Sequence, residues 1–352
     1  MSQLNVNAIR SSNGTGDAIS LTAADKTCTA NITNFPHRNL LINGAMRVAQ
    51  RATSATVGDT GYYVCDRWRT GIGGEDESVT VAQSALTSSD TPYNSGFRYA
   101  TKITNGNQTS GAGATDYLTF TQRLEGQDIN SSGWDFTSTS SKLTVSFWIK
   151  SSVAQTFYSR FRVTEASADK EYVFAVAATT SWQKITKTIP GASGLNPVNT
   201  NAHGFSWDIL LMYGTDYTGT MTLDQWNTVN TSAYVPDMTT TWWTTNDATF
   251  EITGVQLEVS DYPTEFEFRS YGDELAKCQR YYYENSANMY LTKYSTGSIC
   301  NVFNPVTMRA NPTITQGSGF SISQISPYSF YIYKSSGDWG VAENGYEVSA
   351  EL

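Results

Sequence analysis

The sequence predicts an all-β protein, a jelly-roll β-sandwich that leads through a short helix into a small second β unit. Three observations support this prediction. Aromatic residues make up 13% of the 352 residues, with 21 Tyr and 9 Trp, whereas charged residues make up only 16%. Aromatic and β-branched residues favour strands. Many short stretches alternate apolar and polar residues, and the longest of them, from Phe250 to Val259, is followed by a helix signal.

From Arg38 the chain is a succession of short strands separated by turn-forming residues. The stretch from Leu143 to Ile149 is typical, because an apolar residue occupies every second position. The predicted strands are 79–86, 97–104, 117–123, 143–149, 157–163, 172–177, 182–189, 205–213 and 250–259. About nine or ten short strands of this kind indicate a two-sheet sandwich.

The stretch from Thr249 to Tyr283 joins the two predicted units. Its first half is a strand with one buried face, and Gly254 interrupts the alternation as a β-bulge does. Ser270 and Asp273 then precede an apolar pattern at helical spacing. Acidic residues in the first turn favour a helix start. We therefore predict a sandwich over residues 36–269 and a linking helix over 270–284.

The two ends of the chain are predicted to be small β segments. Residues 1–35 contain two short alternating stretches, around Leu4–Ala8 and Ala18–Thr22, which are too short to form a core alone. This segment is either a docking or trimerising element or a disordered tail. Residues 285–352 are a C-terminal β unit, with strands expected at 289–291, 298–303, 306–308, 312–315, 320–322, 329–333 and 346–348. A unit this small gains stability from oligomerisation.

Charge and cysteine usage exclude several classes of protein. The net charge of −9 argues against a nucleic-acid partner, which requires a basic face. No stretch of 18 apolar residues exists, so we expect no membrane insertion. The N-terminus lacks a signal peptide, so we expect synthesis in a cytoplasm. The four cysteines, at 28, 65, 278 and 300, show no C-x-x-C spacing, and we expect buried free thiols.

The sequence offers little for catalysis. It has no G-x-S-x-G, H-E-x-x-H or P-loop motif, and His37 and His203 are its two histidines. A glycosidase needs a pair of carboxylates at a fixed separation, which a sequence cannot show in a sandwich. No repeat typical of long β-helical depolymerases is present. We therefore expect a protein that is not an enzyme and needs no cofactor.

A glycan-binding site is predicted in the long segment from Gly214 to Asp247. Loops of this length inside a compact domain are usually functional or packing elements. Aromatic faces among small polar groups suit sugar rings, and the candidate ligand-binding residues are Tyr213, Asp216, Tyr217, Trp226, Trp242 and Trp243. The alternative is packing: adjacent residues of a strand point in opposite directions, so at least one of the paired tryptophans would belong to the core.

Four blocks of sequence resemble the bacteriophage tail-fibre and virion-appendage family, of the type common in marine phages. The blocks are R-N-L-L-I-N-G-A-M (38–46) with Ala49–Arg51, Tyr62 with C-D-R-W (65–68), Q-R-L-E-G-Q-D (122–128), and I-T-G-V-Q-L-E-V followed by T-x-F-E-F-R-S-Y-G-D-E-L-A-x-C-Q-R-Y-Y (252–282). This resemblance implies a structural protein of the virion, made in a bacterial host, that attaches to a host-surface glycan. It also implies a homotrimer whose N-terminal segment contacts other tail proteins.

A second resemblance concerns residues 60–268. S-F-W-I-K (146–150), W-Q-K (182–184) and the I-T-G-V-Q-L-E strand are similar to jelly-roll carbohydrate-binding modules, and support the architecture more than a ligand. Such modules often hold structural calcium, so the charged residues Asp66, Arg67, Arg123, Glu125 and Asp128 are either a buried ion-pair network or a calcium site. The alternative functions are a purely structural virion connector or decoration protein, or a glycan depolymerase.

Overall fold

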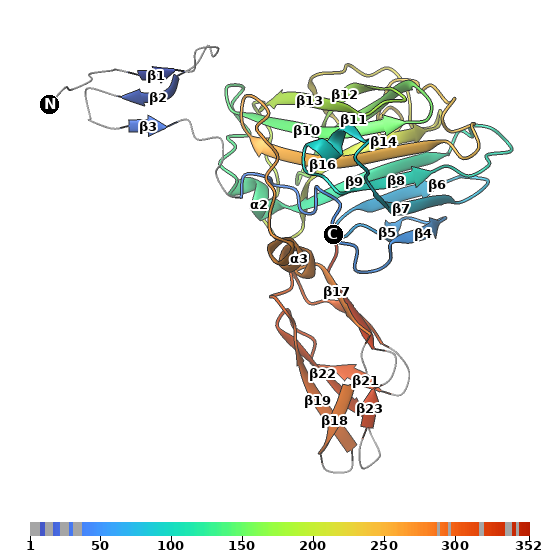
Figure 1. Cartoon of the computed structure of the whole chain (residues 1–352), viewed down its shortest axis with the longest axis vertical. Helices are drawn as coiled ribbons and strands as arrows, with labels where there is room; N and C mark the ends of the chain where they lie inside the picture. Colours follow the sequence, from blue (N-terminus) through green and yellow to red (C-terminus); the bar gives the residue numbers. More distant parts are fainter. Residues whose placement is uncertain are drawn as a thin grey trace.

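The structure is a computed structural model that describes residues 8–10, 17–21, 28–30, 37–286, 289–294, 297–316, 320–334, 340–342 and 345–352. Figure 1 shows a broad sandwich above a narrow C-terminal unit, with a helix at their junction. No helix among these residues is long and apolar enough to cross a membrane.

The sandwich consists of two antiparallel sheets, and the predicted jelly-roll fold class is confirmed. The six-stranded sheet has the order β13 (Gln183–Pro190), β10 (Lys142–Ser151), β16 (Thr249–Val259), β8 (Tyr99–Thr104), β7 (Val79–Ala85) and β4 (Ser54–Val57). The seven-stranded sheet has the order β15 (Trp226–Thr228), β12 (Lys170–Ala178), β11 (Gln155–Val163), β14 (His203–Tyr213), β9 (Tyr117–Glu125), β6 (Arg69–Gly73) and β5 (Gly61–Tyr62). Four short strands, β4, β5, β6 and β15, were not expected from the sequence.

The interior between the sheets is built from the inward residues of both. Phe250, Ile252 and Leu257 of β16 are fully buried there, as their alternation predicted. Aromatic rings bridge the two layers: Phe147 of β10 lies 5.1 Å from Trp207 of β14 between ring centroids. Such pairs contribute about 0.5–1.5 kcal/mol beyond the area that they bury.

The predicted bulge in β16 is present and has a structural use. Gly254 has φ +63, and the register with β10 shifts beside it. Beyond the bulge, β8 no longer pairs with β16, and the segment that begins at Asn39 takes its place. Leu40 N donates to Leu257 O at 2.8 Å, and Val255 N donates to Gly44 O at 3.0 Å.

Three short helices occur in the described part of the chain: α1 (Thr91–Asn94), α2 (Gly126–Asn130) and α3 (Tyr271–Gln279). In α3, the Ser270 side chain accepts a hydrogen bond from Asp273 N at 3.1 Å, as an N-cap residue does. The helix ends before the predicted position of residue 284, because Tyr282–Asn285 forms strand β17 and pairs with β24 (Tyr346–Ser349).

The C-terminal unit contains two small antiparallel sheets over its own apolar cluster. One sheet has the order β17, β24, β20 (Thr313–Gln316), and the other has the order β21 (Ser321–Ser323), β22 (Ser329–Lys334), β19 (Gly297–Phe303), β18 (Met289–Tyr294) and β23 (Gly340–Ala342). The strand expected at 306–308 is wrong. Met308 lies outside the strands and its side chain is buried, and its N–H donates to Pro327 O at 2.9 Å.

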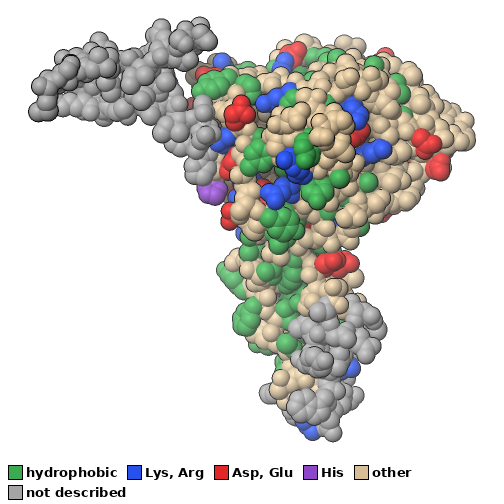
Figure 2. All heavy atoms as spheres, viewed as in Figure 1, with side chains coloured by type: hydrophobic (Ala, Val, Ile, Leu, Met, Phe, Trp, Pro, Cys, Tyr) green, Lys and Arg blue, Asp and Glu red, His purple; other side chains and the backbone are tan. Residues whose placement is uncertain are grey.

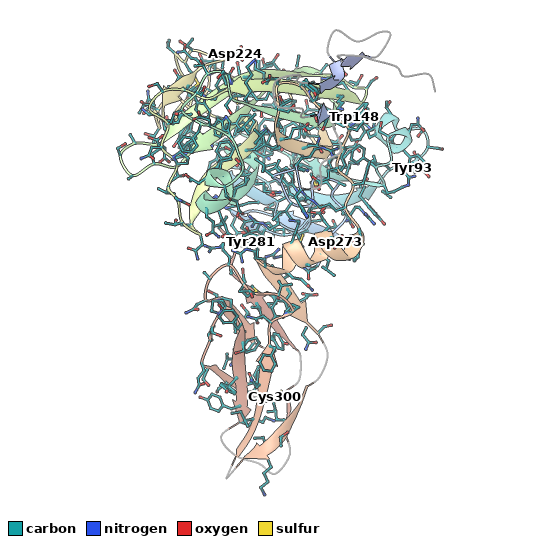
Figure 3. All side chains as sticks on the ribbon, turned by 90° about the vertical axis from the view of Figure 1, so that its left-hand side faces the viewer. Tyr93, Trp148, Asp224, Asp273, Tyr281 and Cys300 are labelled. Carbon is teal, nitrogen blue, oxygen red and sulfur yellow. The ribbon has the colours of Figure 1, made fainter. Side chains whose placement is uncertain are left out.

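The blocks that resemble tail fibres build the joint between the two units. Arg280 donates to Glu125 at 2.8 and 2.9 Å, and Tyr281 donates to the same carboxylate at 2.7 Å. The Arg67 guanidinium lies over the Tyr281 ring at 3.5 Å. Figure 3 shows Tyr281 and Asp273 at this junction. These residues hold the C-terminal unit against the sandwich.

The N-terminal region contains β1 (Ala8–Arg10), β2 (Asp17–Leu21) and β3 (Cys28–Ala30), which form a three-stranded antiparallel sheet. Its docking or trimerising role stays a prediction. Among the cysteines with described side chains, Cys65 and Cys278 are free and buried, and Cys300 is free and partly exposed.

Candidate functional site

The structure overturns the expectation that Trp242 or Trp243 is exposed. Both side chains are fully buried. Trp242 packs edge-on against Phe157 in the core, and Trp243 Nε1 donates to Asp116 Oδ2 at 2.9 Å. The two tryptophans lie in a turn, where Thr244 N donates to Thr240 O at 2.9 Å. A turn lacks the alternation of a strand, so both neighbours point inward.

The other predicted residues fall in two separate places. Tyr213 and Tyr217 lie together, with ring centroids 5.5 Å apart, whereas Asp216 is exposed beside them. Trp226 lies on the edge strand β15, where it packs against Tyr172 at 5.6 Å and donates to Pro190 O at 2.8 Å. The structure therefore groups the two tyrosines and separates Trp226 from them.

A cavity of about 330 Å³ opens on the outer face of the seven-stranded sheet, the face turned away from the core. We call it the arginine hollow. It is lined by Thr60, Arg69, Gly71, Tyr117, Thr119, Thr121, Arg123, Arg160, Arg162, His203, Ser206, Asp208 and Tyr213. Tyr213 is the one predicted site residue among them.

Strand register explains why these side chains meet. Arg69 of β6 pairs with Thr121 of β9, which pairs with Asp208 of β14, which pairs with Arg160 of β11. Residues directly opposite in adjacent strands point to the same face. The next outward row along the sheet contains Arg123, Ser206, Arg162 and Glu171.

Small residues keep the floor of the hollow open. Gly71 has no side chain, and an added Cβ would lie 2.5 Å from Thr119 Oγ1. Gly73 is similar, since an added Cβ would lie 2.6 Å from the Tyr117 ring. With glycine on β6 and threonine on β9, the floor is flat, and the larger arginine and tyrosine side chains stand around it.

The long segment after β14 covers the part of this face that lies next to the hollow. Tyr234 and Val235 from this segment pack with Leu210, Tyr158 and Val173 on the outer face of the sheet. Tyr234 also stacks on Tyr213 at 5.5 Å. The segment thus covers one half of the sheet, and the hollow occupies the half that it leaves open.

Buried polar atoms that make no hydrogen bond lie in the hollow and, at Glu171, beside it, although Arg160 Nη1 forms an ion pair with Glu171 Oε2 at 3.6 Å. Arg160 is 6% exposed; its Nε donates to Asp208 Oδ2 at 2.8 Å, while its Nη1 makes no hydrogen bond. Both carboxylate oxygens of Glu171 and Nε2 of His203 are also without hydrogen-bond partners in the described structure. Unpaired buried groups of this kind are costly in a native protein unless something else binds them.

The electrostatics of the hollow follow from burial. Burial raises the pKa of Glu171 to about 7, although Arg160, 3.6 Å away, opposes the shift. Burial, together with the Arg123 charge, lowers the pKa of His203 to about 4, so this imidazole is neutral at pH 7. The ring can therefore accept one hydrogen bond and donate another.

The carboxylates proposed for calcium do not fit that role. The Glu125 carboxylate accepts hydrogen bonds from Arg280, Tyr281 and Gln127. Asp66 accepts from Gln50 N at 2.9 Å and lies 4.0 Å from Arg51. Within the described residues, no group of three or more His, Cys, Asp or Glu side chains could hold a metal ion. Glu125, Asp66 and Arg67 take part in ion pairs, as the ion-pair alternative predicted.

The sequence contained a signal for the hollow in its strands rather than its loops. The alternating run Tyr158-Ser159-Arg160-Phe161-Arg162 places Tyr158 and both arginines on one face, opposite Phe161. A search for polar faces of strands would have found Arg160 and Arg162. It could not have shown that Arg69, which is 91 positions earlier, lies across the sheet from them.

No protein-family model matches the chain, and no curated protein sequence matches it. Among solved structures, it is similar to the enzymatically active domain of tailspike protein 4 from bacteriophage CBA120, with 10% identity, a TM-score of 0.34, and coverage of 64% of this chain. The match spans only 22% of the tailspike chain.

Two further similar structures are carbohydrate-binding modules. One is the family 11 module of the cellulase Lic26A-Cel5E of Clostridium thermocellum, with 12% identity, a TM-score of 0.29, and coverage of 59% of this chain and 95% of that one. The other is TmCBM61 in complex with β-1,4-galactotriose, with 11% identity, a TM-score of 0.30, and coverage of 63% and 99%. The architecture of the present chain rests on its own strand pairing.

Proposed function

We propose that this protein is a component of a phage tail fibre that adheres to the host surface by binding a glycan in the arginine hollow. The observation that carries the proposal is the nearly buried Arg160, which lines an open cavity on a rigid sheet and whose Nη1 makes no hydrogen bond. Sugar hydroxyls can donate to and accept from such groups. The tyrosine rings of Tyr117 and Tyr213 supply flat surfaces at one end.

We propose binding without cleavage. Retaining and inverting glycosidases generally use two carboxyl groups beside the scissile bond. The one carboxylate that lines the hollow is Asp208, and it is held by Arg160 at 2.8 Å.

We further propose that the protein acts as a homotrimer in the virion, with the N-terminal sheet contacting other tail proteins. The C-terminal unit supports self-association, because Phe303 is 73% exposed and Tyr328 is 65% exposed. Figure 2 shows apolar side chains along this unit. Trimerisation would also raise the effective concentration of shallow glycan sites.

A glycan array with the purified full chain tests the binding proposal. We expect binding to a restricted set of glycans, and Tyr117→Ala should weaken it without a large change in melting temperature, since Tyr117 is only half-buried. The matched control is Trp148→Ala, an aromatic residue of β10 on the opposite sheet, which Figure 3 labels. An array that stays silent, or equal losses in both variants, would contradict the proposed site.

A purely structural role, as a connector or decoration protein, is the second candidate. The exposed aromatic surface of the C-terminal unit favours it, since such surfaces usually mark contacts between proteins. Sedimentation would show a trimer under either proposal. Binding of the purified protein to host cells separates the two, because a connector would not bind them.

A further inference from the structure

We propose that the ligand of the arginine hollow is an acidic saccharide, whose carboxylate or sulfate group is bound beside Arg69, Arg123 and Arg160. This inference rests on the proposed glycan-binding function and specifies its ligand class. Two observations support it. Like charges lie close together in the hollow, and some guanidinium N–H groups there make no hydrogen bond within the described protein.

The hollow concentrates positive charge in an acidic protein. The chain has a net charge of −9, yet four arginines line this one cavity, against the single carboxylate of Asp208. Asp169 lies outside the lining and is paired with Arg162 at 2.7 Å. Glu171 is fully buried beside Arg160. Its burial favours the neutral carboxyl, so near pH 7 it offsets only part of the arginine charge.

Arg69 is the clearest unused cation of the hollow. Its guanidinium makes no hydrogen bond or ion pair with any residue in the described part of the chain. It is partly buried, and both burial and the Arg123 charge lower its pKa, which means that its charged form is not well compensated. Arg69 pairs with Thr121, so Arg123 is its diagonal neighbour on the same face. Like charges in such positions repel and destabilise a sheet.

Arg123 and Arg160 have remaining donors. Arg123 Nη1 donates to a main-chain oxygen of Leu352 at 2.9 Å, which leaves its other N–H groups available. Arg160 uses Nε for Asp208, while its Nη1 makes no hydrogen bond and lies 3.6 Å from Glu171 Oε2 in an ion pair. A bound anion would accept hydrogen bonds from these groups and remove the repulsion between Arg69 and Arg123 at once. Planar guanidinium forks match carboxylate, sulfate and phosphate oxygens.

The tyrosine end of the hollow indicates that the anion is part of a larger molecule. Thr121, beside Arg69, and Tyr117 are four residues apart on β9, which is about 14 Å along a strand. Tyr117 and Tyr213 pair directly across β9 and β14 at that end. A free inorganic anion would use only the arginine end. An acidic oligosaccharide would place its charged group on the arginines and a sugar ring against the tyrosines.

The test is calorimetric titration of the full chain with matched oligosaccharides. One pair is an oligogalacturonide and its carboxyl-reduced neutral counterpart, and the other pair is a sulfated galactan fragment and its desulfated form. We expect at least one acidic member to bind about tenfold or more tightly than its neutral partner, because hydrogen bonds to charged groups are stronger than those between neutral groups. The two pairs distinguish a carboxylate from a sulfate ligand.

Two variants with the same change of charge assign the effect to the hollow. Arg69→Gln should abolish the preference for the acidic glycan, whereas Lys184→Gln should keep it, since Lys184 is exposed on β13 of the opposite sheet. Melting temperatures check that both variants fold. If Arg69→Gln fails to fold, the salt dependence of wild-type binding decides, because affinity for an acidic ligand should fall as ionic strength rises.

The outcomes separate this inference from the proposed function. Equal binding of acidic and neutral glycans, sensitive to Tyr117→Ala, would overturn the acidic ligand and leave glycan binding intact. An absence of binding to any glycan in the titrations and on the array would overturn both. Binding of a single-stranded DNA oligomer as tightly as the acidic glycan would show a general anion site and would also overturn this inference.

Discussion

The two sheets of the sandwich share one interior but have outer faces of different kinds. On the six-stranded sheet, polar groups are matched by the protein's own chain. Lys150 pairs with Glu251 at 2.9 Å, and Glu258 accepts from Thr264 N at 2.8 Å. On the seven-stranded sheet, Arg160, Glu171 and His203 keep polar atoms that nothing in the described structure satisfies. Unpaired groups on one face therefore indicate where an external partner binds.

The difference arises from which segments return across each face. The connector after β16 lies against the six-stranded sheet, where Glu267 N donates to Gln256 Oε1 at 2.7 Å and Phe266 packs near Phe97 and Trp148. The long segment after β14 covers only part of the seven-stranded sheet. The connector after β16 thus covers part of the outer face of the six-stranded sheet. On the seven-stranded sheet, the segment after β14 leaves part of the outer face uncovered, and the arginines lie there.

The largest expected effect tests whether the long segment after β14 is anchored in the core. Trp243→Ala should lower the free energy of unfolding by about 3–5 kcal/mol, because it removes a buried aromatic side chain and one of the hydrogen bonds to Asp116. Denaturant unfolding followed by fluorescence measures this. A nearly unchanged midpoint would mean that the segment is not anchored in the core, and the contrast between the two faces would lose its structural basis.

The next effect compares one cation from each face. Arg160→Met should cost about 3 kcal/mol or more, because it leaves Asp208 and Glu171 buried without their cation. Lys150→Met should cost about 1 kcal/mol or less, since its pair with Glu251 is partly exposed to water. Equal costs in chemical denaturation would show that the two faces are electrostatically alike.

The smallest effect concerns pH. Glu171 faces Arg160, Arg162 and Asp208, and burial raises its pKa from 4.5 to about 7. Between these values the folded protein holds a proton that the unfolded chain has lost, so this group stabilises the fold below about pH 4.5 and the stabilisation is lost as pH rises through 7. Glu171→Gln should remove this dependence, which is on the order of 1–3 kcal/mol.

Thermal melts of wild type and Glu171→Gln from pH 4.5 to 8 measure the difference. His203, with its pKa lowered to about 4, contributes a slope of opposite sign in part of this range. Both proteins retain His203, so its contribution cancels when the stability of Glu171→Gln is subtracted from that of the wild type. The remaining difference reports the ionisable carboxyl of Glu171. A constant difference in stability across the range would mean that Glu171 keeps an ordinary pKa.

The strands could be predicted because alternation links sequence position to a face of a sheet. The burial of Phe250, Ile252 and Leu257, and the bulge at Gly254, were readable in this way. The short strands β4, β5 and β15 were missed, because two to four residues carry too little alternation to be recognised. The paired tryptophans were misjudged, since alternation does not apply inside a turn.

The sequence by itself determined that the chain forms two layered sheets, which strand residues face the core, and that a capped helix follows β16. These features depend on neighbours within about ten positions, where the period of a strand or a helix constrains each side chain. The arginine hollow was decided only in the tertiary structure. Arg69, Arg123 and Arg160 come from three separate strands, and their meeting depends on sheet order and register. Whether the arginine hollow stays open depends in turn on how far the segment after β14 covers the seven-stranded sheet.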